Sequence, residues 1–440
     1  MKESKYNLYI PNKDNVIFYN TLTEAILIVS KKTYQKFIHA QEDYNGLKEI
    51  DAKMFDDLCE SGFLIEDCRD EYQELSFYNK KTTFDNESYS LTILPTLDCN
   101  LRCWYCFEKH LKGSRIEAVT LDKIYKYTRR LADEKNCKYL KIELFGGEPL
   151  LYFEEDIFPL LKNIQDCYSS KEKQLSLLIV TNGVCLTEKI IDKLSYFNLV
   201  FFQISIDGTK EKHDHVKFFP DTKEGTFEKV IHNIQYMTDT LENVKVTLRI
   251  NYDKQTLKEI DLLLPYLETL NRKKVVIHLE KVWQIKKEKY INTLLMDALN
   301  LFMRNGFYVS YANFVRRNFS CKSDKYNQAV ISYDGKVYKC TGRDFEEKSE
   351  EGTLTNDGNI VWNEEKLAKR IGTASFTNPK CRNCKMLPLC WGPCGQKYLE
   401  MGEETIEKYC QLNQLELSLE DFIRYKVNNY MIMGKEFEYT

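Results

Sequence analysis

The sequence predicts an α/β fold with three parts: a partial (β/α)6 barrel of the TIM type, a small winged-helix-like N-terminal domain and a cysteine-rich C-terminal domain. Three observations lead to this prediction. Between residues 88 and 305, six apolar runs alternate with helical patterns, as in a parallel sheet with crossover helices. Polar or glycine-rich turns follow several of these runs. Most of the 15 cysteines in the 440-residue chain stand in two patterned groups.

Residues 1–80 are predicted to form the N-terminal domain. Two short apolar runs on either side of a turn-forming segment indicate a hairpin, and two helical patterns and a closing strand follow. Gly62 stands where a helix C-cap is expected, because many helices end at a glycine. The predicted segments are residues 6–10, 16–19, 31–40, 52–60 and 63–65. This order is winged-helix-like; recognition of a partner and simple packing against the barrel are both open roles.

The barrel is predicted over residues 88–305, after a polar linker at 71–87. Its strands are expected at residues 90–94, 139–145, 175–180, 200–206, 244–250 and 275–279. Helices are expected between them, for example at residues 121–134, 188–196, 227–237 and 257–267. Right-handed crossovers curl such a sheet toward a barrel, and six units are too few to close one. Active sites of this architecture lie at the C-terminal ends of the strands.

Cys99, Cys103 and Cys106 follow the first predicted strand with the spacing C-x3-C-x2-C. Closely spaced cysteine thiolates hold iron–sulfur clusters, usually four to a cluster. Three thiolates leave one iron open to bind something that reacts. A structural zinc site is the alternative, with His110 as a fourth ligand.

Further polar and glycine-rich turns follow the later strands. Glycines allow a backbone to approach a ligand closely, a carboxylate accepts from an ammonium group, and serine with aspartate suits sugar hydroxyls. An arginine can meet a carboxylate. Tight turns and a surface ion pair are the plainer alternatives. The residues are Gly146, Gly147, Glu148, Thr181, Asn182, Gly183, Ser205, Asp207, Arg249 and Asn251.

Seven more cysteines occupy residues 306–440, which are predicted to form the third domain with a C-terminal helix. They are Cys321, Cys340, Cys381, Cys384, Cys390, Cys394 and Cys410. The surrounding chain has few long apolar runs, so metal is expected to supply its folding energy. A zinc ribbon would use only four of them. The remaining cysteines, without ligand spacing, are predicted to be small core residues: Cys59, Cys68, Cys137, Cys167 and Cys185.

The first motif, with Tyr105 just before its third cysteine, resembles the signature of the radical S-adenosylmethionine (radical SAM) enzymes. The resemblance implies that Cys99, Cys103 and Cys106 hold a catalytic [4Fe–4S] cluster whose open iron binds S-adenosyl-L-methionine. It also implies a cofactor pocket. Gly146, Gly147 and Glu148 would hold the methionine amino group, and Ser205 and Asp207 the ribose. The pocket would be completed by Thr181, Asn182, Arg249 and Tyr105.

The C-terminal cysteines resemble the SPASM extension, which carries auxiliary [4Fe–4S] clusters in many radical SAM enzymes. The resemblance assigns one fully ligated cluster to Cys381, Cys384, Cys390 and Cys410 and a second cluster to Cys321, Cys340 and Cys394. With the first motif, this implies three [4Fe–4S] clusters. Residues 322–327 lack the further cysteine of fuller patterns. The second cluster is therefore expected to have an open iron or another ligand, for which Asp324 is a candidate.

The N-terminal segment resembles peptide-recognition domains of ribosomal-peptide (RiPP) maturases. The resemblance implies an oxidoreductase that takes an electron from a donor such as flavodoxin or ferredoxin, cleaves S-adenosylmethionine and abstracts hydrogen from a precursor peptide with a leader sequence. The favoured outcome is a thioether from a cysteine sulfur to a carbon. The alternatives are a carbon–carbon cross-link, formylglycine formation in a sulfatase, or a non-catalytic iron–sulfur electron carrier.

The composition is that of a globular protein: 43% hydrophobic and 29% charged residues. A net charge of -3 implies no nucleic-acid partner. No apolar run has the length of a membrane span, and the first residues form no apolar signal segment. A cytoplasmic location is expected, where disulfides are rare and clustered cysteines indicate metal or catalysis.

Overall fold

The computed structural model describes residues 1–41, 43–285, 291–312 and 314–433. It divides into two compact units. Unit 1 contains Met1–Phe84, Asn313–Lys325 and Lys369–Met431, and unit 2 contains Asp85–Ala312 and Tyr326–Ala368. The C-terminal region, expected as one domain over residues 306–440, is thus divided between the two. The segment in unit 2 supplies strands to the barrel sheet, which explains the division.

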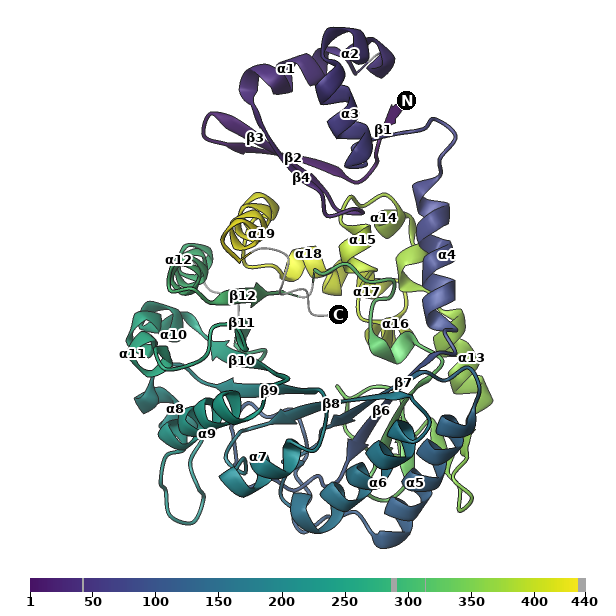
Figure 1. Ribbon diagram of the computed structural model, residues 1–440, viewed down its shortest axis with the longest axis vertical. Coiled ribbons are helices and arrows are strands. Elements are labelled where there is room, and N and C mark those ends of the chain that lie inside the picture. The colour runs from purple at the N-terminus through teal and green to yellow at the C-terminus, as the bar shows by residue number, and fades with distance from the viewer. Residues whose placement is uncertain (42, 286–290, 313, 434–440) are drawn as a thin grey trace. The chain divides into compact units, whose positions relative to one another are not determined.

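Unit 2 is built on a mixed sheet that, in the described residues, has eleven strands in the order β12-β11-β10-β9-β8-β7-β6-β13-β14-β15-β16 (Figure 1). The six expected strands are β6 (Ser88–Leu94), β7 (Tyr139–Leu144), β8 (Gln174–Thr181), β9 (Val200–Ile206), β10 (Val244–Tyr252) and β11 (Val275–Lys281). Each pairs in parallel with the next, which confirms the predicted parallel sheet.

Two further parallel strands extend this sheet: β12 (Tyr308–Tyr311) beside β11, and β13 (Gln328–Ser332) beside β6. An antiparallel edge follows β13, formed by β14 (Lys336–Tyr338), β15 (Gly352–Leu354) and β16 (Ile360–Trp362). The strand order begins at β12 and ends at β16, so the sheet stays open. This agrees with the predicted partial barrel.

The helices of unit 2 follow the strands, and α5 to α9 lie along one face of the sheet (Figure 1). They are α5 (Ala118–Asp133), α6 (Phe158–Ser169), α7 (Glu188–Leu194), α8 (Lys210–Val216), α9 (Phe227–Thr240), α10 (Lys254–Lys258), α11 (Leu264–Leu267) and α12 (Ile291–Arg304). The single helix expected at 257–267 is wrong. It is broken into α10, a 3-10 turn and α11, which has Pro265 in its first turn. Proline has no N–H to continue a preceding helix.

Alternate residues of β8 and β9 are buried, while those between them are partly exposed. Strand residues point alternately to the two faces of a sheet, so one face packs into the core and the other stays accessible. Ser205 is on the accessible face. The C-terminal ends of the strands and this face therefore present the polar residues predicted from the sequence.

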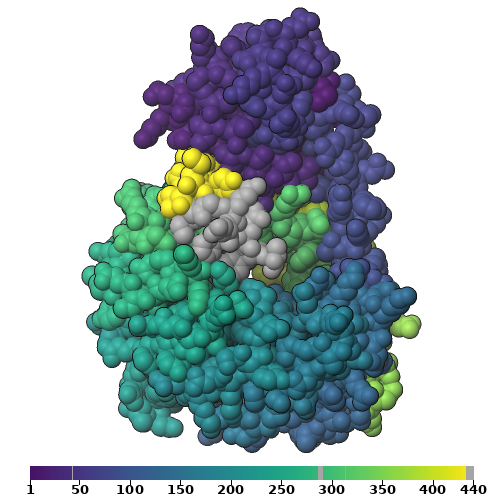
Figure 2. All heavy atoms as spheres, viewed as in Figure 1, coloured from purple at the N-terminus to yellow at the C-terminus, as the bar shows by residue number. Residues whose placement is uncertain are grey.

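The N-terminal segment of unit 1 contains the predicted hairpin, β2 (Asn7–Asn12) paired with β3 (Asn15–Asn20). Three elements were not predicted: β1 (Lys2–Glu3), β4 (Ile26–Ser30), which pairs with β3, and α2 (Tyr44–Ile50). The predicted helices are α1 (Lys31–His39) and α3 (Ala52–Glu60), and β1 (Lys2–Glu3) pairs with β5 (Leu64–Ile65). Gly62 has a φ of +76° directly after α3, as expected for a glycine that ends a helix. Figure 2 shows these segments in purple.

The linker predicted at residues 71–87 is wrong, because Glu71–Thr83 forms helix α4. Asp70 caps it by accepting a hydrogen bond from the Gln73 N–H at 3.0 Å. Acidic residues in its first turn and lysines in its last complement the helix dipole. The main apolar side chain that this polar helix buries is Leu75.

The C-terminal part of unit 1 is a set of short helices followed by a longer one. They are α14 (Pro379–Arg382), α15 (Leu387–Cys390), α16 (Gly395–Met401), α17 (Glu404–Tyr409), α18 (Gln411–Gln414) and α19 (Leu419–Met433); α13 (Glu364–Gly372) precedes them. The expected C-terminal helix is α19, and residues 434–440 lie outside the described residues. No helix of the described chain is long and apolar enough to cross a lipid bilayer.

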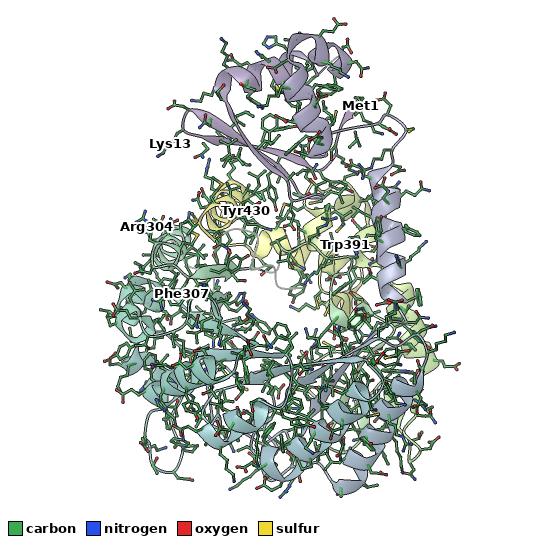
Figure 3. All side chains as sticks on the ribbon, viewed as in Figure 1. Met1, Lys13, Arg304, Phe307, Trp391 and Tyr430 are labelled. Carbon is green, nitrogen blue, oxygen red and sulfur yellow. The ribbon has the colours of Figure 1, made fainter. Side chains whose placement is uncertain are left out.

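The N-terminal segment shares a hydrophobic core with the cysteine-bearing helices of the same unit. Tyr6 and Leu75 pack with Phe376, Leu387 and Trp391, whose side chain is fully buried (Figure 3). The Lys5 ammonium donates to the Arg382 carbonyl at 2.7 Å, and the Thr21 hydroxyl donates to the Lys385 carbonyl at 2.5 Å. Residues 1–84 therefore fold against the C-terminal cysteine segment.

Candidate active site

The loop between β6 and α5 carries the first cysteine motif, and Asp98 braces it. Its Oδ1 accepts from the Cys99 N–H at 2.8 Å and its Oδ2 from the Gly113 N–H at 2.8 Å. The Arg102 guanidinium lies 3.2 Å from Oδ1. The Thr96 hydroxyl accepts from the Asp98 N–H at 2.8 Å. One carboxylate thus ties together both ends of the loop.

The three thiols of this loop lie close enough to influence one another. Burial, then the nearby Glu148 carboxylate and the other two thiols, raises the pKa of Cys99 to about 12. Burial also raises the pKa of Cys103 to about 11, although the Lys217 ammonium opposes this. Burial raises the pKa of Cys106 as well. Cys99 and Cys103 are partly buried and Cys106 is exposed. Three neighbouring thiols whose ionisation is disfavoured are a donor set that cationic iron would stabilise as thiolates.

This donor set fits a [4Fe–4S] cluster, because three thiolates can hold three of its irons. His110, the candidate fourth ligand of a zinc site, lies with its Nε2 3.5 Å from the Cys106 Sγ. Within the described residues, no group of three or more His, Cys, Asp or Glu side chains could hold a single metal ion. His110 is therefore a neighbour of Cys106, but the side chains of this loop are not arranged as a single-ion site.

Gly146 and Gly147, after β7, pack directly against the cysteine loop. A Cβ on Gly146, which has a φ of +113°, would lie 2.5 Å from the Thr96 carbonyl oxygen. A Cβ on Gly147 would lie 2.0 Å from the Asp98 carbonyl oxygen. The Gly147 and Glu148 N–H groups donate to these two carbonyls at 3.1 and 2.8 Å. The contact that demands glycine here is therefore with the loop backbone.

Replacing Gly147 by alanine is expected to displace the cysteine loop, since no methyl group fits 2.0 Å from a carbonyl oxygen. Overpacking of this kind costs about 1–3 kcal/mol. We expect less iron per chain after anaerobic reconstitution, measured by metal analysis. Gly372→Ala is the control, because a Cβ there meets nothing within 4 Å. Equal iron in both variants would contradict this account of the turn.

Glu148 is fully buried and links the turns after β7 and β8. Its Oε1 accepts from the Thr181 hydroxyl at 2.7 Å, and its Oε2 accepts from the Asn182 N–H at 2.9 Å. Burial raises its pKa to about 7, against the opposing effect of these hydrogen bonds. The Asn182 amide donates to the Asn100 side chain at 2.7 Å and lies 3.7 Å from the Cys99 Sγ. The predicted residues of these turns are therefore brought together; contact of Glu148 with a substrate ammonium stays a prediction.

A second network connects the ends of β9 and β10 to the cysteine loop. Arg249 is paired in register with Ser205, at the ends of these parallel strands. Its Nε donates to the Asn251 Oδ1 at 2.9 Å. The Asn251 amide donates to the Tyr105 hydroxyl at 3.0 Å and to the Asp207 Oδ1 at 3.2 Å. The Tyr105 hydroxyl donates to the same Asp207 oxygen at 2.6 Å.

Asp207 and Ser205 both contact Lys217, a buried lysine just after α8. The Lys217 ammonium lies 3.1 Å from the Asp207 Oδ2 and donates to the Ser205 Oγ and carbonyl, both at 2.7 Å. Burial alone would raise the pKa of Asp207, but the charges of Lys217 and His213 hold it below its usual range. The two predicted ribose ligands thus lie together, and their contact with a ribose stays a prediction.

Sequence reasoning missed Lys217, Asn100 and Gln284, and it noted Asn251 without a role. Asn251 follows Arg249 by two residues, so the strand-end signal could have assigned it. The Gln284 amide donates to the Tyr105 carbonyl, from the loop after β11. Lys217 lies in a polar stretch with no motif around it, and only the fold brings it to Asp207.

The auxiliary cysteines Cys381, Cys384, Cys390 and Cys410 come together in unit 1. Burial, then the other thiols of the group, raises the pKa of Cys381 to about 11. The pKa of Cys390 rises to about 12, mainly through burial. The four thiols are therefore close enough to affect one another's pKa, and their ligation of one cluster stays a prediction.

Two of the ligands assigned to the other auxiliary cluster, Cys321 and Cys394, belong to unit 1. Burial, then Asp324 and Cys394, raises the pKa of Cys321, so these three side chains are neighbours. The Asp324 Oδ2 accepts from the Cys321 N–H at 3.0 Å.

The cysteines expected to be small core residues differ in burial. Cys137 is buried, as expected. Cys68 is exposed, so that prediction is wrong for it. Cys185 is partly buried and accepts from the Asn100 amide at 3.6 Å, beside the first motif. Cys59 and Cys167 are also only partly buried.

The family model of the radical SAM superfamily matches residues 93–267 of the chain. Among curated relatives, a GTP 3′,8-cyclase of Clostridium perfringens is 26% identical and covers 70% of this chain and 95% of its own length. A cysteine-type anaerobic sulfatase-maturating enzyme of Clostridium novyi is 26% identical over 70% of this chain and 88% of its own. The radical SAM cyclopropyl synthase TigE of Paramaledivibacter caminithermalis is 22% identical over 89% of each chain.

Two solved structures have a similar fold. Streptococcus suis SuiB bound to its precursor peptide SuiA has a TM-score of 0.52 at 16% identity, covering 93% of this chain and 98% of that one. The structure of anSMEcpe with bound AdoMet has a TM-score of 0.54 at 20% identity, covering 78% of this chain and 96% of that one.

Proposed function

Residues 93–267 form a radical SAM domain, and from this premise we propose that the protein is an enzyme that matures a ribosomally made precursor peptide. The observation that carries the proposal is the set of three neighbouring thiols at Cys99, Cys103 and Cys106, on a loop braced by Asp98 at the C-terminal end of β6. The radical SAM domain implies a [4Fe–4S] cluster and S-adenosylmethionine.

When bound, these two groups supply an electron and a hydrogen-abstracting 5′-deoxyadenosyl radical. The chain's own residues hold and shield the site. Cys99, Cys103 and Cys106 would ligate the cluster, and Gly147 lets the next turn close tightly on their loop. Glu148 joins that turn to Thr181 and Asn182. These contacts hold the turns in fixed positions, and a pre-positioned site lowers the entropic cost of orienting the reactants.

A peptide substrate is supported by the relatives and by the N-terminal segment. The sulfatase-maturating enzyme is named for the maturation of a protein, and SuiB was solved with a bound precursor peptide. GTP 3′,8-cyclase is instead named for a nucleotide. The hairpin and β4 form a three-stranded sheet with β4 at an edge. An exposed edge can accept an extended peptide as an additional strand. We propose that a leader sequence binds there.

Ile28 tests the leader site, because it lies on β4 with 44% of its surface exposed. Ile28→Asp should weaken binding of the leader peptide at least about tenfold, or about 1.4 kcal/mol. Charges on edge strands disfavour pairing with another strand. The control is Ile50→Asp on α2, where the side chain is 68% exposed. Isothermal titration of leader peptide measures both; unchanged affinity in Ile28→Asp would reject the β4 site.

The proposed product is a thioether between a substrate cysteine and a carbon. Its formation replaces one S–H and one C–H bond by an S–C bond. One hydrogen atom, one proton and one electron therefore leave the peptide, and bound S-adenosylmethionine would supply the acceptor of the hydrogen atom. Auxiliary clusters at the seven C-terminal cysteines, giving three clusters in all, would take this electron, and flavodoxin or ferredoxin would supply the first.

The second candidate, formylglycine formation, is favoured by the 26% identity to the sulfatase-maturating enzyme. Incubation with a cysteine-containing precursor peptide, followed by mass spectrometry and thiol alkylation, separates the two. A thioether product keeps its sulfur, loses its free thiol and is lighter by two hydrogens. Formylglycine made from cysteine lacks the sulfur. A modified peptide that still alkylates at every cysteine would contradict both.

The auxiliary cluster assigned to Cys321, Cys340 and Cys394 provides a further test of thioether chemistry. We propose that its open iron binds the substrate thiolate, since metal sites favour a deprotonated thiol. Cysteine-containing peptide should then perturb the auxiliary-cluster spectrum, and its serine analogue should do so much less. Asp324→Ala should retain the cluster. Equal spectra with both peptides would reject thiolate ligation.

A further inference from the structure

Lys217 is an ammonium buried at the centre of the polar network, with 2% of its surface exposed. It follows directly after α8, and its three acceptors all lie at the end of β9. They are the Ser205 carbonyl and Oγ at 2.7 Å and the Asp207 Oδ2 at 3.1 Å. The two Ser205 oxygens accept hydrogen bonds from the ammonium, and the Asp207 carboxylate supplies the opposite charge. Burying a charge is costly unless it is paired, so this position is unusual for a lysine.

The network around Lys217 includes the cysteine loop. Tyr105 lies on that loop between Cys103 and Cys106. Its hydroxyl donates at 2.6 Å to the Asp207 carboxylate that forms the ion pair with Lys217. One carboxylate therefore links the lysine to a residue that stands between two of the predicted cluster ligands.

Lys217 also holds the position of the loop through Asp207. One oxygen of Asp207 faces the ammonium, and the other accepts from the Tyr105 hydroxyl at 2.6 Å and the Asn251 amide at 3.2 Å. Tyr105 directly precedes Cys106 in the chain. A chain of contacts thus runs from Lys217 through one carboxylate to the residue before the third thiol.

We propose that Lys217 is a positioning residue whose fixed positive charge favours the reduced, more negative state of the cluster at Cys99, Cys103 and Cys106. The inference rests on the proposed function only in taking these cysteines as the cluster ligands. A nearby cation raises a reduction potential because it stabilises the added electron. Lys217 acts in two ways: it supplies a positive charge, and it favours the ionised form of Asp207, which accepts the hydrogen bond of the Tyr105 hydroxyl.

The test is a redox titration of the full-length, anaerobically reconstituted protein, followed by electron paramagnetic resonance. The signal that changes on adding S-adenosylmethionine identifies this cluster among the others. In Lys217→Met, the ratio of reduced to oxidised cluster at a fixed potential should fall about tenfold, equivalent to a potential lower by about 59 mV for a one-electron couple. Lys210→Met is the matched control, since Lys210 lies on α8 and pairs with Asp214 at 3.2 Å. It should leave the potential unchanged.

A double-variant cycle distinguishes a direct effect of the Lys217 charge on the cluster from an indirect effect, in which Lys217 only neutralises the charge of Asp207. If Lys217 only compensates Asp207, then Lys217→Met should have no effect in an Asp207→Asn background. The proposal expects the potential to fall in both backgrounds. A fall only in the presence of Asp207 would overturn it.

Lys217→Gln and Lys217→Arg keep the test decisive if Lys217→Met does not retain its cluster. Retention of iron and potential in the arginine variant, with loss of either in both neutral variants, supports the proposal. Equal potentials in charged and neutral variants would overturn it, and so would loss of iron in all three. Because no peptide is present, failure here is distinguishable from failure of the proposed peptide chemistry, which is judged by the modified product.

Discussion

A variant with Cys99, Cys103 and Cys106 all replaced by alanine is expected to lose about four iron atoms per chain and to form no 5′-deoxyadenosine. If all three clusters are present, the reconstituted parent holds about twelve iron, because each cubane contributes four. The three thiols occupy one braced loop, and their removal leaves no set of ligands for the reactive cluster there. Metal analysis and chromatography of the reaction products measure the two effects.

The control for this variant replaces Cys59, Cys68 and Cys167, which lie outside both patterned groups. It should keep its iron and its 5′-deoxyadenosine formation. Product formation by the first triple variant would disprove the assignment of the reactive cluster. Zinc in place of iron after strictly anaerobic purification would instead favour the structural-metal alternative with His110.

Trp391→Ala is expected to have the largest effect on stability, because it opens the core that the N-terminal segment shares with the auxiliary cysteines. Trp391 is fully buried and its indole N–H donates to the Pro388 carbonyl at 2.8 Å. Its ring meets Phe376 edge-on, with centroids 5.2 Å apart. Loss of a buried tryptophan side chain costs about 3–5 kcal/mol. We expect a lower free energy of unfolding by denaturant titration.

The same variant should lose about four iron, since Cys390 immediately precedes Trp391 and Cys381 packs at the edge of this core. Phe77→Ala is the control: it lies on α4 in the same unit but is 61% exposed. It should change both quantities little. Normal iron content in a destabilised Trp391→Ala protein would show that the cluster does not depend on this core.

The elements that could be predicted from the sequence have strong local signals. The strands of the barrel are short β-branched and aromatic runs, and β9 occurs at the expected bounds, Val200–Ile206. The hairpin of β2 and β3 follows a turn-forming segment. Polar α4 was missed because its local pattern is that of an exposed linker. Its contacts are with distant parts of the chain: Leu75 and Tyr72 pack on the shared core, and the buried Glu71 accepts from the Ser4 hydroxyl at 2.6 Å.

The candidate site was predicted in its residues more than in their contacts. Parallel strands bring their C-terminal ends to one edge, so the residues after β6 to β10 had to meet. The contacts of these residues could not be predicted. A glycine is needed at position 147 because the Asp98 carbonyl lies where a Cβ would be, and the Glu148 carboxylate accepts hydrogen bonds from Thr181 and Asn182. These contacts join residues distant in the chain.

By itself, the sequence determined the parallel sheet, the cysteine loop and the order of polar turns, because each is encoded by neighbouring residues whose chemistry and periodicity are local. Only the tertiary structure decided that residues 1–84 fold with the C-terminal cysteines and that Lys217 forms a buried ion pair with Asp207. A shared core and a buried ion pair depend on which surfaces exclude water together. Which surfaces meet is a property of the whole folded chain, and the spacing of residues within a short segment does not predict it.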